Sequence, residues 1–206
     1  EIDVVALIGP SHHFYSTAIV TAKHDAYQTP LGLVPIDRAA LATLSKTFPL
    51  EAVRNDPEHC LEIELPFLQR ALESDFRLIP LALLDQSLTM AEELGAVLAE
   101  ILKDQKALLV ASSDLSHFYP QTVAKQYDQQ VLDAVNDYDP ARVIQAEAQG
   151  RKIACGHGAI ATIMIAARAL GANSAQVVNY GVGDARGDGS SVVGYGAAVF
   201  YESETV

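Results

Sequence analysis

The sequence predicts an α/β fold with three layers, in which helices cover both faces of a mostly parallel or mixed sheet. Short runs of apolar, β-branched residues, typical of buried strands, alternate along the chain with longer segments of helical periodicity. No internal repeat, low-complexity tract or linker divides the 206 residues, which are enough to fill one core. We therefore expect a single domain over residues 1–206.

The first half of the chain is expected to form two strands followed by two helices. Val4–Ile8 is a short apolar run closed by a Gly-Pro turn, the profile of a buried strand, and Ala18–Ala22 is a second strand candidate. Asp37–Phe48 is typical of a helix, with its aspartate as N-cap and leucines at helical spacing. Glu58–Leu72 is another helix candidate, although Pro66 should kink it or limit its first turn.

The second half continues the alternation. Leu78–Leu84 and Ala107–Ala111 are apolar runs expected to be strands, and Ser87–Leu102 between them carries leucines at helical spacing. Three further helices and two late strands complete the prediction: Gln121–Val135, Pro140–Ala148, Gly156–Leu170, Val177–Asn179 and Ala197–Tyr201. A glycine-rich loop over Gly181–Gly196 is expected to separate the two late strands.

Composition excludes several classes of partner. The chain has 26 acidic and 14 basic residues, a formal charge of −12, so it would repel a polyphosphate backbone and we expect no nucleic-acid partner. No apolar run is long enough to span a bilayer, and we expect no membrane partner. Two cysteines form no disulfide framework, which indicates a reducing compartment, and we expect a cytoplasmic protein. The oligomeric state stays unknown at this point.

Two polar clusters directly follow predicted strands, where open α/β sheets place their ligand crevices. His12 and His13 lie just beyond Val4–Ile8, and Asp114 and His117 lie just beyond Ala107–Ala111. Imidazole is the commonest metal ligand and the side chain best suited to proton transfer near neutrality. If a helical turn starts at Asp114, its carboxylate and His117 project to one side. Taken singly, each cluster is explained as well by a solvated turn or a helix cap.

Two further segments carry reactive side chains. His59 and Glu62 are one turn apart on a predicted helix, whereas Glu58 is explained equally well by the helix dipole. Cys155, followed closely by His157, heads an apolar helix, whose dipole would lower the thiol pKa and favour a nucleophile or soft ligand. The alternative for this cysteine is a buried, inert thiol.

The identity and order of these segments resemble one family. The motifs are GPSHH at Gly9–His13, EHCLEIELPF at Glu58–Phe67, SSDLSH at Ser112–His117 and CGHGAI at Cys155–Ile160. This series resembles the MEMO family, whose bacterial members are also called AmmeMemoRadiSam system protein B. The resemblance implies a class III extradiol dioxygenase-like fold with a pocket at the equivalent of the non-haem iron site.

The resemblance also implies the site residues and the metal. Carried over by motif, the expected metal ligands are His12, Asp114, His117 and Cys155, of which the last three are also expected to be catalytic, while His13, His59 and His157 are expected to line the pocket. Fe(II) is the expected cofactor, with copper or zinc as alternatives. The dioxygenases have a carboxylate where this family has a thiol, which departs from the two-His-one-carboxylate arrangement suited to oxygen activation.

The resemblance further implies a segment that this sequence does not contain. Family members carry an earlier strand that ends in a P-H-A-G-Y type segment with another histidine ligand. We therefore expect the 206 residues to lack an N-terminal βα segment.

Three functions follow as hypotheses. The first is a metal-binding, redox-active and dioxygenase-like oxidoreductase that takes a small molecule or peptide in its pocket. The second is a non-catalytic module for peptides or phosphopeptides, which at a charge of −12 would need a local basic patch that the sequence does not show. The third is a cysteine hydrolase with Cys155 as nucleophile and His117 or His12 as base.

Overall fold

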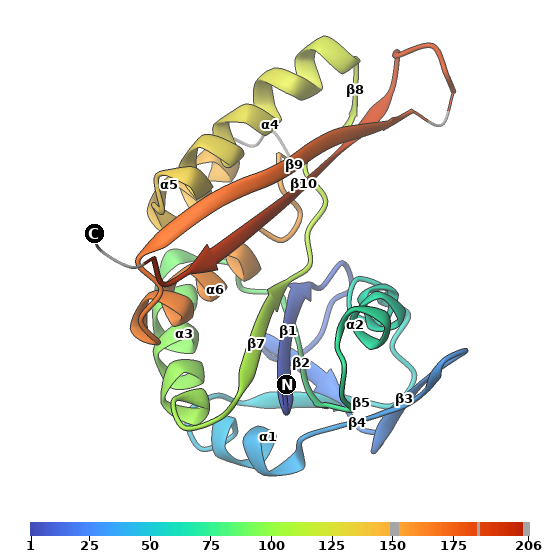
Figure 1. Ribbon diagram of the computed structural model, residues 1–206. Helices are drawn as coiled ribbons and strands as arrows, with labels where there is room; N and C mark the ends of the chain where they lie inside the picture. Colours follow the sequence, from blue (N-terminus) through green and yellow to red (C-terminus); the bar gives the residue numbers. More distant parts are fainter. Residues whose placement is uncertain (149–152, 185, 204–206) are drawn as a thin grey trace.

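A five-stranded mixed sheet forms the centre of the protein in the computed structural model, which describes residues 1–148, 153–184 and 186–203 (Figure 1). Its strands, in the spatial order β5-β2-β6-β1-β7, are β5 (Leu50–Val53), β2 (Ile19–Ala22), β6 (Arg77–Leu83), β1 (Val4–Pro10) and β7 (Ala107–Ala111). Strand β1 runs parallel to β6 and β7, whereas β2 runs parallel to β5 and antiparallel to β6. The mixed sheet that the sequence predicts is confirmed.

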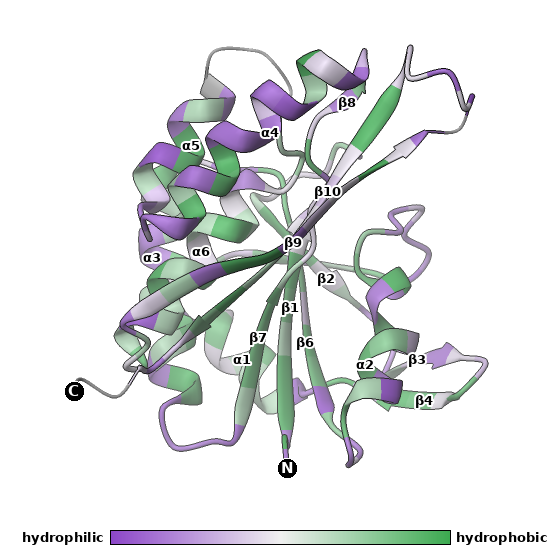
Figure 2. Cartoon of the chain, turned by 45° about the horizontal axis from the view of Figure 1, so that its top comes forward, coloured by the Kyte–Doolittle hydropathy of each residue, from purple (hydrophilic) through white to green (hydrophobic). Residues whose placement is uncertain are grey.

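Helices cover both faces of this sheet. The elements α1 (Arg38–Leu44), α3 (Leu88–Leu102) and α6 (His157–Ala169) share one hydrophobic cluster with Val4, Ala6 and Ile8 of β1. The other face packs through Val5 and Leu7 against α2 (Leu65–Ala71), which follows the short 3₁₀ turn η1 (Glu62–Glu64). Because successive side chains of a strand point to opposite faces and both faces are covered, β1 lacks polar side chains, as Figure 2 shows for β1 and β7.

A second layer of structure packs beside the central sheet. It contains an antiparallel sheet with the strand order β8-β10-β9, formed by β8 (His117–Tyr119), β9 (Ser174–Asp184) and β10 (Val192–Tyr201). Helix α4 (Gln121–Asn136) packs against it, and α5 (Pro140–Ala148) packs against α4 and α6. These elements bury a separate apolar cluster that includes Leu115, Val131 and Met164. An apolar groove of about 540 Å³ lies between β7 and β10. A small ribbon of β3 (Ala26–Thr29) and β4 (Gly32–Pro35) completes the strands.

The predicted glycine-rich loop over Gly181–Gly196 is wrong for most of its length. The two late strands extend to Ser174–Asp184 and Val192–Tyr201 and pair almost continuously as one long hairpin. Glycines lie inside these strands because neighbouring side chains approach the backbone closely. A Cβ atom on Gly183 would lie 2.9 Å from the Tyr195 ring, and one on Gly194 would lie 2.0 Å from Asp128 Oδ2.

Other local predictions also differ from the structure. Glu58–Leu72 is not one helix: residues 58–61 precede the 3₁₀ turn η1, and the α-helix begins only at Leu65, next to Pro66. Strands β3, β4, β5 and β8 were not predicted, being only three or four residues long. The N-cap of α1 is confirmed, because Ala40 N–H donates to Asp37 Oδ1 at 2.9 Å. Within the described ranges, no helix has the length and apolar character needed to cross a membrane.

Candidate metal site at the carboxyl ends of the strands

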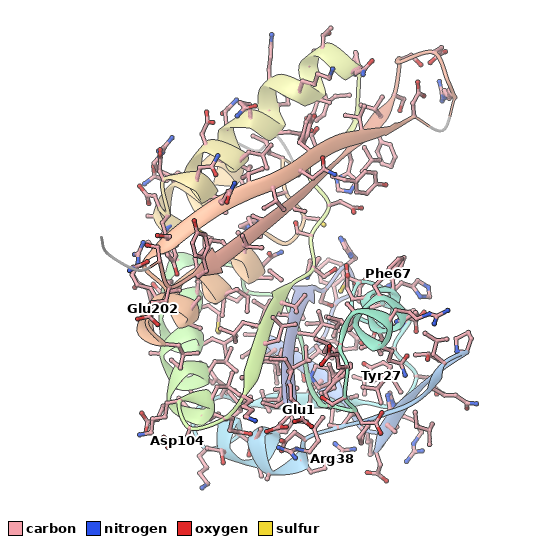
Figure 3. All side chains as sticks on the ribbon, in the orientation of Figure 1. Glu1, Tyr27, Arg38, Phe67, Asp104 and Glu202 are labelled. Carbon is pink, nitrogen blue, oxygen red and sulfur yellow. The ribbon has the colours of Figure 1, made fainter. Side chains whose placement is uncertain are left out.

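The segments that follow β1 and β7 start side by side at one edge of the sheet. The two strands are parallel neighbours, with Ile8 in register with Ala111, and Ser112 N–H donates to Ile8 O at 2.8 Å. The histidine segment after β1 and the aspartate segment after β7 therefore leave the sheet at the same edge, as the sequence predicts. In Figure 3, the labelled Phe67 lies level with this edge of the sheet, and Glu1 lies at the opposite end.

Asp114 and His117 are in contact. His117 Nε2 donates to Asp114 Oδ2 at 3.2 Å, and the two side chains are 25% and 46% exposed, respectively. The expected helical turn is absent here, because residues 112–116 form a loop that leads directly into β8. The pairing of the two side chains was predicted, but the backbone that brings them together is different.

Cys155, which lies two residues before α6, contacts the backbone of Asp114. Asp114 N–H donates to Cys155 Sγ at 3.3 Å, and Cys155 N–H donates back to Asp114 O at 3.3 Å. Gly156 N–H donates to Ser113 Oγ at 2.8 Å, and a Cβ on Gly156 would lie only 2.5 Å from Ser112 O. Glycine is therefore needed for this close approach of two backbones. We call Asp114, His117 and Cys155 the Asp114 cluster.

The expected low pKa of Cys155 is wrong. Burial raises the pKa of this thiol above its ordinary value of 9.0, and the charge of Asp114 acts in the same direction. Hydrogen bonds from Asp114 N–H and from Ser113 lower the pKa but do not outweigh burial. Cys155 also precedes α6, whose N-cap is Gly156, so the helix dipole is not the main influence on the thiol pKa.

On the β1 side, Glu58 orients His12. Glu58 Oε2 accepts from His12 N–H at 2.7 Å and lies 3.0 Å from His12 Nδ1. Its other oxygen accepts from His59 N–H at 2.9 Å and from Cys60 N–H at 3.2 Å. With Nδ1 held by a carboxylate, the His12 ring presents Nε2 to a ligand, the arrangement typical of metal-binding histidines. We call His12 and Glu58 the His12 pair.

The helix-dipole explanation of Glu58 is not supported. Residues 58–61 are not helical, and the Glu58 side chain is only 8% exposed. Burial opposes ionisation of Glu58, but the backbone donors of His12, Cys60 and His59 together with the His12 ring hold its pKa below the ordinary value. From the sequence, the helix dipole was the favoured explanation of Glu58, and the separation of 46 residues from His12 gave no clue to their pairing.

The three histidines that were expected to line the pocket have different surroundings. His13 is exposed, the His59 side chain is 78% exposed and pairs with Glu62 at 2.9 Å, and His157 Nδ1 donates to Ala154 O at 3.0 Å. Across the part of the chain that the structure describes, no hydrogen bond or ion pair joins these rings to the Asp114 cluster. Their expected role in lining the site stays a prediction.

Two residues that the sequence did not single out lie near Asp114. Glu64 Oε1 accepts from Ser112 Oγ at 3.4 Å, and burial, followed by the charge of Asp114, raises the pKa of this half-buried carboxyl. Burial and the same charge raise the pKa of Tyr195 on β10. Neither residue has a spacing in the sequence that would have pointed to the site.

The second cysteine, Cys60, lies on the His12 side of the site. It donates through Sγ to Pro10 O at 3.0 Å, and its N–H donates to Glu58 Oε1 at 3.2 Å. Burial raises the pKa of its thiol, and the charge of Glu58 adds to that effect. Cys60 therefore carries its proton beside the end of β1.

The donor types at this edge suit a borderline metal, although they do not form a complete coordination site as they stand. Thiol, imidazole and carboxylate groups are the ligands of iron, copper and zinc in proteins. In residues 1–148, 153–184 and 186–203, no three His, Cys, Asp or Glu side chains are grouped as metal ligands. The Asp114 carboxylate is instead paired with His117.

Comparison with known families supports the resemblance. The family model described as Memo-like protein matches residues 1–199. The chain belongs to the Memo family. A MEMO1 family protein of Nitrosopumilus maritimus is 35% identical over 202 residues, covering 96% of this chain and 74% of that protein. One from Methanococcoides burtonii is 34% identical over 201 residues, covering 96% and 75%.

Comparison with solved structures supports the fold. The structure of an uncharacterized protein from Escherichia coli K12 superposes with a TM-score of 0.55 at 13% identity, covering 93% of this chain and 85% of that one. At this identity the likeness concerns the fold alone. Memo-family membership thus comes from the sequence comparisons, and the likeness of fold comes from the solved structure.

Proposed function

We propose that this Memo-family protein binds a metal ion through His12, Asp114, His117 and Cys155. Fe(II) is the first candidate, with copper or zinc as alternatives. The observation that carries the proposal is the Asp114 cluster, in which the His117 imidazole contacts the Asp114 carboxylate and the Cys155 thiol accepts a hydrogen bond from the Asp114 backbone. The His12 ring, oriented by Glu58, leaves the sheet at the same edge.

Each residue of the candidate site has a distinct role in this proposal. Glu58 fixes the His12 ring, and Asp114 and His117 hold each other in place until a ligand separates them. Cys155 carries its proton in the free protein because burial raises its pKa, so coordination would release that proton. A bound iron or copper ion would supply redox and Lewis-acid chemistry.

The proposed activity is that of an oxidoreductase acting on a small molecule or peptide. Ring cleavage of the dioxygenase kind is the less favoured form, because Cys155 contributes sulfur where a carboxylate suits oxygen activation. The same proposal places the protein in the cytoplasm. Its two cysteines, Cys60 and Cys155, are both free thiols, as a reducing compartment would keep them.

The test uses the protein purified without a histidine tag. Metal content is measured first, followed by anaerobic loading with Fe(II) and an oxygen-uptake screen with catechols. Stoichiometric metal that depends on Cys155 supports the proposal. A protein that takes up no Fe(II), copper or zinc, yet binds peptides, would favour the peptide-binding alternative and refute the metal site.

A further inference from the structure

Asp128, in the middle of α4, is a buried carboxylate outside the proposed ligand set. It is 0% exposed, and both of its oxygens are hydrogen bonded. Oδ1 accepts from Ser116 N–H at 2.8 Å, and Oδ2 accepts from the Tyr180 hydroxyl at 2.7 Å. A buried charge is tolerated only when it is hydrogen bonded in this way, so these contacts fix its position.

Ser116, whose N–H is bound by Asp128, is also held through its carbonyl oxygen. Gly194 N–H donates to Ser116 O at 2.9 Å, and Leu115 N–H donates to Gly194 O at 2.9 Å. The Asp128 carboxylate fills the space where a Cβ on Gly194 would lie, 2.0 Å from Oδ2. Both backbone polar groups of Ser116 are therefore fixed, one by α4 and one by β10.

His117 directly follows this fixed residue and precedes a strained one. Phe118 has a φ of +64°, in the left-handed region that residues other than glycine rarely adopt. Such a conformation persists where the surrounding structure determines it. The Ser116 contacts, the pairing of His117 with Val193 and the conformation of Phe118 together leave the His117 backbone little freedom.

We propose that Asp128 is a positioning residue, which sets His117 against Asp114 by anchoring Ser116. The inference rests on the proposed metal site for its functional meaning. It explains why a buried carboxylate on α4 is connected to β9, β10 and the loop after β7, and why the strand that passes it has glycine at position 194. Asp128 itself does not contact the proposed ligands.

The test compares variants that disturb the anchor from different sides. Asp128→Ala removes the carboxylate, Gly194→Ala places a methyl group against it, and Asp128→Asn can still accept from Ser116 and offer a donor to the Tyr180 oxygen. Asp133→Ala, on the same helix but exposed, is the matched control. The probes are Co(II) affinity, followed through its thiolate absorption, and the His117 ring resonances of the metal-free protein.

We expect Asp128→Ala and Gly194→Ala to weaken Co(II) binding by about 10–100-fold, as the loss of an orienting residue does. Both should also shift the His117 resonances, whereas Asp128→Asn and Asp133→Ala should resemble the parent. Folded Asp128→Ala and Gly194→Ala proteins with parental Co(II) affinity and unchanged His117 resonances would overturn the inference.

If those two variants do not fold, Tyr180→Phe decides, because it removes only the hydroxyl that fixes Asp128 Oδ2. Shifted His117 resonances in this variant support the inference, and unchanged ones refute it. A parent protein that binds no Co(II) would refute the proposed metal site instead. The His117 resonances would still show whether Asp128 positions the ring.

Discussion

The two sides of the candidate site differ in how firmly the fold holds them. In the Asp114 cluster, two hydrogen bonds join Asp114 to Cys155, just before α6. His117 follows Ser116, which is fixed by α4 and β10. The His12 pair depends on one carboxylate, and the His12 side chain is 54% exposed. A ligand that bridges the two sides would therefore find one of them already in place and order the other.

The largest expected effect is on the firmly held side. Cys155→Ser should weaken Fe(II) or copper binding by more than the roughly 10–100-fold loss that an orienting residue causes, because it removes a ligand. The fold should be nearly unchanged, since serine differs little from cysteine in volume. Equilibrium metal titration and thermal unfolding measure the two effects.

His12→Ala is the comparison variant for this experiment. If Cys155→Ser binds metal as tightly as the parent while His12→Ala does not, Cys155 is a packing residue. The more exposed side would then carry the affinity, and the contrast between the two sides would be reversed.

The next largest effect concerns Glu58, the carboxylate that holds the His12 ring. Glu58→Gln should destabilise the protein by roughly 1.5–3 kcal/mol, the range for a hydrogen-bonded charged group, because several backbone donors lose a charged acceptor. It should also weaken metal binding by about 10–100-fold by releasing the His12 ring. Urea unfolding and metal titration test this. Glu62→Gln, at an exposed carboxylate that pairs with His59, is the matched control and should change neither property appreciably.

The pH dependence of the unfolding free energy gives a finer test of the role of Glu58. The pKa of Glu58 is lowered in the folded protein, so its contribution to stability is present above the ordinary value of 4.5. That contribution is lost as the pH falls through the lowered value. The difference in unfolding free energy between the parent and Glu58→Gln should therefore be constant above about pH 4.5 and shrink below it. A difference that grows on acidification would show that Glu58 is not stabilised as a carboxylate.

The main strands and helices were predictable because their apolar periodicity has a local cause. Val4–Ile8 and Ala107–Ala111 were found this way, and their parallel pairing then placed the polar segments at one edge. The long hairpin was not predictable, because its glycines resemble loop residues until the side chain of Asp128 is seen against Gly194. Long-range contacts of this kind have no signature in the local sequence.

Motifs in the sequence pointed to the residue types of the candidate site, but not to the side chains that hold them. His117 contacts the Asp114 carboxylate and Cys155 contacts the Asp114 backbone, whereas Glu58 and Asp128 acquire their roles only from partners elsewhere in the fold. The pKa of Cys155 was predicted in the wrong direction because helix position is visible in a sequence and burial is not.

The smallest expected effect separates the metal site from the cysteine hydrolase. Burial raises the pKa of both thiols, further for Cys60 than for Cys155, and only the thiolate reacts with iodoacetamide. In the metal-free protein, alkylation at pH 7 should be slow at both residues, accelerate above pH 9, and remain faster at Cys155 than at Cys60. Peptide mass spectrometry assigns each site, with Cys60→Ser and Cys155→Ser as controls.

Adding Fe(II) or Zn²⁺ should protect Cys155 and leave the rate at Cys60 unchanged, because only Cys155 belongs to the proposed ligand set. Rapid alkylation of Cys155 at pH 7 without metal protection would indicate a free thiolate, and the nucleophile hypothesis would then displace the metal site.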